Sequence, residues 1–221
     1  MTTVHTVTMA DAIGASANNL PTSLAKVGGY DTGSPPVPWS TAQWNRFIKS
    51  GHVHINQDPG SDPLIGDVLD SEAGAWSIPG AVEALKKRKA AGKSLNVYIS
   101  IASLTGLANA LVAAQLAPVG IWLANWNLTE SQAAALVVSQ SGPFPIKAVQ
   151  WASPSSNPAT ILPGSGMTLK QANADLSVAD ASWFPAPVGT PPPPPPVTVS
   201  AVLVRGLVSR IVHSTDGIHW Q

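Results

Sequence analysis

The chain has 221 residues and balances 12 Lys and Arg against 12 Asp and Glu, so its formal net charge is zero. Charged residues make up only 11% of it, against roughly 25% in an average soluble domain, which argues against a nucleic-acid partner because phosphate binding needs a basic excess. The chain has no cysteine, and this excludes disulfides, thiolate catalysis and Cys-ligated zinc.

Short apolar runs alternate with helical patterns along most of the chain. Strands are predicted at 27–31, 52–56, 67–71, 95–101, 120–124, 146–151 and 174–178. Helices are predicted at 41–50, 79–92, 104–116 and 129–140. This alternation is typical of α/β proteins with a mainly parallel sheet. Because no glycine-rich phosphate loop follows a strand, we predict a TIM-like (β/α) barrel, regular or irregular, with its chemistry at the C-terminal ends of the strands.

A run of six prolines at 191–196 divides the chain. We expect an N-terminal extension at 1–26, the barrel at 27–184 and a semi-rigid proline-rich linker at 185–196. Residues 197–221 alternate as strands do and contain the turn signals Arg205-Gly206 and Asp216-Gly217. They predict a β-hairpin-like tail that docks, self-associates or binds a partner, with disorder as the alternative.

Neither a membrane span nor a secretory signal is recognisable. The longest apolar stretches, such as 108–114 and 133–138, are far shorter than the roughly 20 residues of a membrane helix. The first residues lack a basic region followed by an apolar one. We therefore expect no membrane partner and no secretory signal of the chain's own.

Two carboxylic acids end the predicted strand in the segment GDVLDSEAG. Asp70 and Glu72 are two residues apart, so they share one face of an extended strand, about 7 Å apart. A pair of carboxyls suits acid/base work, because burial and a neighbouring charge can keep one protonated while the other is ionised. The alternative is a solvated loop that has no chemical role.

Polar and aromatic residues end most of the other predicted strands, as the rim of an active site requires. These residues are Asp31, Asn125, Trp126, Gln150, Trp151 and Asp175. Indole rings pack against sugars as well as in cores, so Trp122, Trp126 and Trp151 fit either a carbohydrate site or the interior. His52 and His54 have no third partner in sequence, so we predict neither a metal nor a cofactor.

These motifs, GYD, the Asp70-Ser71-Glu72 triplet, IWLANW, AVQW and ADLS, occur in an order that resembles the family-25 glycoside hydrolases. Glycoside hydrolase-like barrels of actinobacteria and their phages are the most similar members. The resemblance covers roughly residues 27–184. It implies a lysozyme-like muramidase that cleaves peptidoglycan on an irregular α/β barrel.

The resemblance also implies roles for individual residues. Glu72 would be the general acid, and Asp70 would stabilise the oxocarbenium-like state or orient the substrate's acetamido group. Asp31 and Asp175 would complete an acidic floor, while Tyr98, Trp122 and Gln150 would line the sugar site. The segment HVHINQDPG at 52–60 matches no motif of the family.

Combined with the linker and tail, the resemblance implies a virion-associated phage product, commonly a minor tail protein or an endolysin, made in the host cytoplasm. Its partners would be bacterial cell-wall glycan and other virion proteins bound through residues 197–221, and a homo-oligomer stays open. Two alternatives stay open. One is a non-catalytic structural or wall-binding virion protein that keeps the barrel, and the other is an enzyme acting on another wall sugar, such as arabinogalactan.

Overall fold

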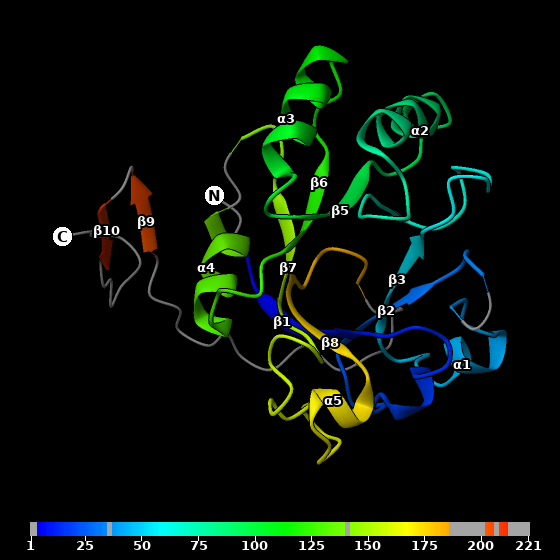
Figure 1. Cartoon of the computed structure of the whole chain (residues 1–221), viewed down its shortest axis with the longest axis vertical. Coiled ribbons are helices and arrows are strands. Elements are labelled where there is room, and N and C mark those ends of the chain that lie inside the picture. The colour runs from blue at the N-terminus through cyan, green and yellow to red at the C-terminus, as the bar shows by residue number, and fades with distance from the viewer. Residues whose placement is uncertain (1–3, 35–36, 140–141, 186–201, 206–207, 212–221) are drawn as a thin grey trace.

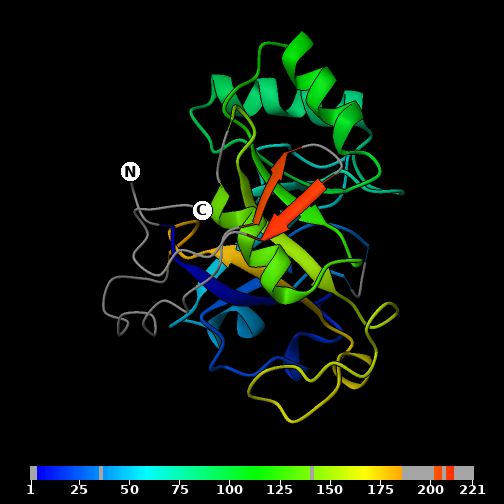
Figure 2. The same cartoon turned by 90° about the vertical axis from the view of Figure 1, so that its left-hand side faces the viewer.

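The computed structural model describes residues 4–34, 37–139, 142–185, 202–205 and 208–211. The chain forms an α/β fold whose eight strands close into one barrel with helices packed around it (Figures 1 and 2). The expected TIM-like architecture is therefore confirmed. No helix within the described residues has both the length and the apolar character needed to cross a bilayer.

The barrel strands are β1 (Thr6–Asp11), β2 (Lys26–Tyr30), β3 (Gly51–Asn56), β4 (Val68–Asp70), β5 (Asn96–Ser100), β6 (Gly120–Ala124), β7 (Ile146–Ala152) and β8 (Asp175–Asp180). The helices are α1 (Thr41–Asn45), α2 (Ile78–Ala90), α3 (Leu104–Ala113), α4 (Glu130–Ser139) and α5 (Leu169–Ala172), with a 3-10 turn at Ala17–Asn19. Helices α2 and α3 lie side by side, and α4 packs along β7 (Figure 1).

The first strand of the barrel lies within the segment expected to be an N-terminal extension. Strand β1 pairs in parallel with β2 and antiparallel with β8, so it closes the barrel. The barrel thus begins at Thr6 rather than at residue 27. Its side chains alternate, because Met9 lies in the interior while Ala10 packs on the outer side.

The barrel is irregular because its last strand runs backwards. Strands β1 to β7 are parallel to one another, whereas β8 is antiparallel to both β7 and β1. The first residue of β8 therefore lies beside the last residue of β1, and the register pairs Asp175 with Asp11. This reversal brings the start of β8 to the end of the barrel where the parallel strands finish.

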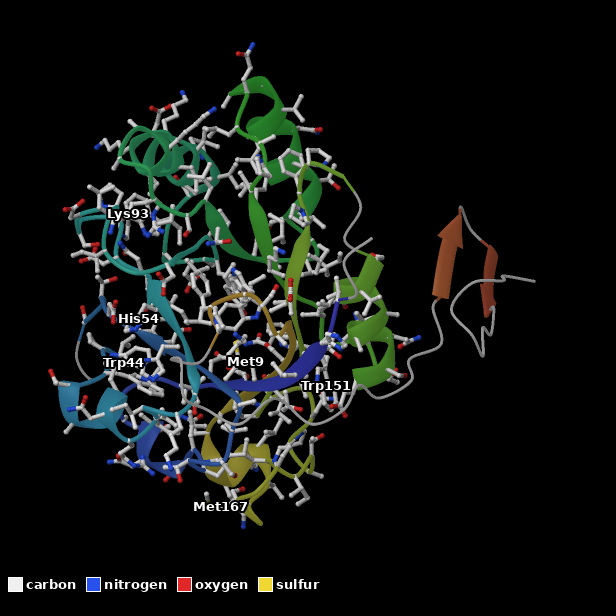
Figure 3. All side chains as sticks on the ribbon, turned by 180° about the vertical axis from the view of Figure 1, so that it is seen from behind. Met9, Trp44, His54, Lys93, Trp151 and Met167 are labelled. Carbon is white, nitrogen blue, oxygen red and sulfur yellow. The ribbon has the colours of Figure 1, made fainter. Side chains whose placement is uncertain are left out.

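Two layers of apolar side chains hold the barrel together. Inside it, Met9 packs with Val53, Tyr98, Trp122 and Trp183. Figure 3 shows the position of Met9 in the barrel. Outside it, the apolar faces of α2, α3 and α4 cover the outward residues of β5, β6 and β7. The N-cap of α2 is Ser77, whose side chain accepts a hydrogen bond from the Gly80 amide, with a proline following at the start of the helix.

The end of the barrel where the parallel strands begin is plugged by the segment that follows β8. Trp183 enters the interior and meets Trp122 at a ring-centroid distance of 6.1 Å. The Lys26 ammonium donates hydrogen bonds to the carbonyls of Trp183 and Phe184. Burial lowers the pKa of Lys26 to about 8, although Asp180 opposes this shift. The opposite end of the barrel stays free for chemistry.

The expected linker at 185–196 lies outside the described residues beyond Pro185. In the tail, β9 (Val202–Arg205) pairs antiparallel with β10 (Val208–Ile211), while Gly206 of the first turn signal lies outside the described residues. The second turn signal, Asp216-Gly217, also lies outside the described residues.

Candidate active site

Four carboxyl groups meet where the parallel strands end. Asp11 ends β1, Asp70 ends β4, Glu72 follows β4, and Asp175 begins the reversed β8. The charges of Asp175, Asp70 and Glu72 all act on Asp11, and the charge of Glu72 acts on both Asp70 and Asp175. We call these four residues the carboxyl cluster.

Burial is the main reason why the carboxyl cluster holds protons. Asp11 and Asp70 are 2% and 3% exposed. Burial first and like charge second raise the pKa of Asp70 to about 7 and that of Asp175 to about 7. The same causes hold the pKa of Asp11 well above its ordinary value, and burial also raises the pKa of Glu72. At neutral pH the cluster thus contains both protonated and ionised carboxyls.

One amide side chain and one backbone amide hold the buried aspartates. Gln150, which is 2% exposed, accepts hydrogen bonds from the Tyr98 hydroxyl at 2.7 Å and from Trp126 Nε1 at 3.1 Å. Because these two donors fix the Gln150 side-chain oxygen, Gln150 Nε2 points to Asp11 and donates to both of its carboxyl oxygens at 3.4 Å. On the other side, the Glu72 backbone amide donates to Asp70 Oδ1 at 3.1 Å.

The floor of the site depends on close backbone packing. A Cβ atom at Gly28 would lie 2.8 Å from the Asp11 Cβ and 3.0 Å from the Trp122 ring. Glycine is therefore required there, because a larger residue would displace Asp11. Trp122 itself is fully buried, donates to Ser177 Oγ at 3.1 Å and packs beneath the site, where a ligand does not reach it.

Glu72 is the member of the carboxyl cluster that faces open space. It lines a hollow of about 480 Å³ between the loops that follow β4 and β5, together with Trp76, Ser100 and Ser103. The nearby Tyr98 hydroxyl partly opposes the rise of the Glu72 pKa. An accessible carboxyl with a raised pKa is suited to donate a proton to a bound ligand.

An apolar platform follows β5 and β6. Trp126 is 40% exposed and Ile101 is 46% exposed. The Ile101 amide donates to the Ala124 carbonyl at 2.9 Å, which ties the two loops together. Since Gln150 holds the edge of the Trp126 indole, part of the ring stays open for stacking on a ligand.

Asp31 does not join the carboxyl cluster. Its carboxylate accepts a hydrogen bond from His54 Nδ1 at 2.8 Å, on the outer side of β2 and β3. The neighbouring Tyr30 points the other way, since all four members of the cluster raise its pKa, after burial. Trp44 stacks on His54 at 4.0 Å between ring centroids, and the two lie side by side in Figure 3. Asp31 is thus the partner of His54, which Trp44 covers, and lies outside the carboxyl cluster.

The other expected residues lie at the rim or beside it. The Asn125 amide donates to the Gln150 carbonyl at 2.9 Å, and its side chain accepts from the Asn127 amide. Trp151 points out of the barrel, opposite to Gln150, and packs near α4 (Figure 3). The barrel mouth thus brings together six of the expected residues: Asp70, Glu72, Asp175, Tyr98, Gln150 and Trp126.

Asp11, Tyr30 and Gln57 also belong to the site, although sequence reasoning did not select them. Asp11 ends an alternating run, TVTMAD, as the other strand-end residues do. Among the described residues, no three or more His, Asp or Glu side chains are arranged to hold a metal ion.

Comparison with known proteins gives no family for the chain, because no protein-family model and no curated protein matches it.

Proposed function

We propose that the barrel is a peptidoglycan-directed, lysozyme-like glycoside hydrolase of a phage virion-associated protein. The observation that carries the proposal is the carboxyl cluster at the barrel mouth, with Glu72 opening into the hollow and Asp70 buried beside it. Hydrolysis of a glycosidic bond needs one carboxylic acid and one carboxylate. Burial raises the pKa of both Asp70 and Glu72, which favours a carboxyl pair that holds a proton.

In the proposed reaction, protonated Glu72 gives its proton to the glycosidic oxygen as the bond to the anomeric carbon breaks. Ionised Asp70 stabilises the positive charge that develops on the sugar or orients its acetamido group. Water then adds to the anomeric carbon and returns a proton to the cluster. The platform of Ile101 and Trp126 offers an apolar surface to a sugar ring of the same strand.

The placement in a virion rests on the family resemblance and on the tail after the proline run. In this proposal residues 197–221 bind other virion proteins, and the barrel meets the cell-wall glycan. A barrel that binds the wall without cleaving it is the second candidate, since both Asp11 and Asp70 are almost completely buried.

The test compares the wild type with Glu72→Gln on peptidoglycan purified from an actinobacterium. Loss of the proton donor is expected to reduce the release of reducing ends at least about 10²-fold. The matched control is Glu83→Gln, because Glu83 is an exposed residue of α2 that pairs with Lys86, and its activity is expected to stay at the wild-type level.

An active Glu72→Gln variant would remove Glu72 from the reaction. If the wild type binds the glycan but releases no reducing ends, the second candidate holds instead. Mass spectrometry of the products separates peptidoglycan fragments from those of other wall sugars, such as arabinogalactan.

A further inference from the structure

The loop after β3 enters the active site through one side chain. Gln57 Nε2 donates a hydrogen bond to Asp70 Oδ2 at 3.3 Å, while the Glu72 amide serves Asp70 Oδ1. Gln57 belongs to the segment 52–60, which matches no motif of the glycoside hydrolase family that the chain resembles. Among the described residues, it is the one side chain that donates to Asp70.

Neighbouring residues hold both the backbone and the side chain of Gln57 in place. Its backbone N–H donates to Thr32 Oγ1 at 2.9 Å, and Thr32 Oγ1 donates to Asn56 Oδ1 at 2.9 Å. On the far side, a Cβ atom at Gly33 would lie 3.3 Å from Gln57 Oε1, and Gly33 has a φ of +123° that favours glycine. The loop thus fits closely around the side chain that reaches Asp70.

Burial and the like charge of Glu72 make the negative charge of Asp70 less favourable. The other titratable groups at this end of the barrel are Asp11 of β1, Tyr30 of β2, Tyr98 of β5 and Asp175 of β8, and the charge of Asp70 acts on Asp11 and Tyr30. A donated N–H bond favours the ionised form of a carboxyl. Gln57 and the Glu72 amide are therefore the two contacts that favour an ionised Asp70.

We propose that Gln57 is a positioning residue that holds the Asp70 carboxyl and favours its ionised form, against the burial and the like charge that favour its protonated form. This inference rests on the proposed function only for its consequence in catalysis. The contact itself exists whether or not the barrel cleaves a glycan.

The direct test is the titration of the Asp70 carboxyl, followed by carbon NMR in protein labelled at aspartate and assigned with Asp70→Asn. Gln57→Met keeps the length of the side chain but has no donor, and Gln57→Glu adds a charge. The midpoint is expected to rise by about half to one pH unit in Gln57→Met and further in Gln57→Glu. An unchanged midpoint in either folded variant overturns the proposal.

The second arm measures the pH dependence of kcat/KM on peptidoglycan. The acidic limb of the profile is expected to move to higher pH by the same amount in Gln57→Met, with kcat more affected than KM. Gln132→Met is the control, since Gln132 caps α4 at the surface. A uniform loss at every pH, with an unshifted limb, would indicate a merely structural role and overturn the proposal. If the wild type cleaves nothing, the proposed function fails while the titration still decides the role of Gln57.

Discussion

The carboxyls of Asp70 and Asp175 are stabilised in their protonated forms, and this makes stability depend on pH. Their pKa values are raised to about 7 in the folded chain, against about 3.9 when unfolded. The folded state thus binds more protons between these values, so the stabilisation present below pH 4 is lost as the pH rises through 7. The pKa of His54 is also raised, so its contribution to stability is likewise lost as the pH rises. We expect a higher Tm at pH 5 than at pH 8 by scanning calorimetry.

Removing one charge from the cluster tests this explanation. Asp175→Asn is expected to raise the Tm at pH 8 by about 2–4 °C, because one like charge is lost, and to change it little at pH 5. Exposed Glu83→Gln should leave the Tm unchanged at both values. A lower Tm of Asp175→Asn at pH 8 would show that repulsion is not what limits stability there.

Of the four residues in the carboxyl cluster, the sequence predicted Asp70, Glu72 and Asp175 as site residues but not Asp11. The first three follow clear apolar runs or belong to recognisable motifs. Asp11 ends a strand whose threonines made it resemble a polar extension. Asp31 was expected in the acidic floor, but strand alternation turns its neighbour Tyr30 inward and leaves Asp31 to pair with His54.

At the scale of elements, Asn56 joins the loops that surround the active site. Its Oδ1 atom accepts from Thr32 Oγ1, Ser61 Oγ and Trp76 Nε1 at 2.9, 3.0 and 3.3 Å. Its Nδ2 group donates to the carbonyl of Asp62 at 3.0 Å. Three loops are thus fixed by one fully buried amide.

Asn56→Ala is therefore expected to reduce the free energy of unfolding by about 2–4 kcal/mol, because several buried polar groups lose their partner. Urea unfolding measures the change. The control Asn127→Ala removes an exposed amide and should cost less than about 0.5 kcal/mol. If both variants unfold at the same urea concentration, the loops do not depend on Asn56.

Most elements could be predicted from periodicity, because β6 coincides with the expected 120–124 and α2 starts one residue before the expected 79–92 and ends two residues before its end. The expected helix at 41–50 ends at Asn45 in the structure, where α1 is followed by turns. Strand direction could not be predicted. The antiparallel course of β8 is decided by closure against β1 and β7, which are distant in sequence.

At the scale of the whole molecule, the barrel and its plug end at Pro185. We expect a chain of residues 1–185 to unfold at the same temperature as the full chain, because all barrel strands and the Lys26 contacts are present. A chain of residues 1–180 loses the Trp183 and Phe184 contacts and is expected to unfold several degrees lower. Equal transitions for the two shorter chains would show that the plug contributes nothing.

In the proposed function the carboxyl cluster hydrolyses a glycosidic bond of peptidoglycan, so an oxygen atom from water enters each new reducing end. The most direct measurement is digestion of purified peptidoglycan in ¹⁸O-labelled water, followed by mass spectrometry of the soluble fragments. We predict that the wild type releases fragments with one ¹⁸O at each new reducing end and that Glu72→Gln releases almost none. If the wild type releases no soluble fragments and leaves the peptidoglycan without ¹⁸O at every pH between 5 and 8, the proposed hydrolysis is contradicted.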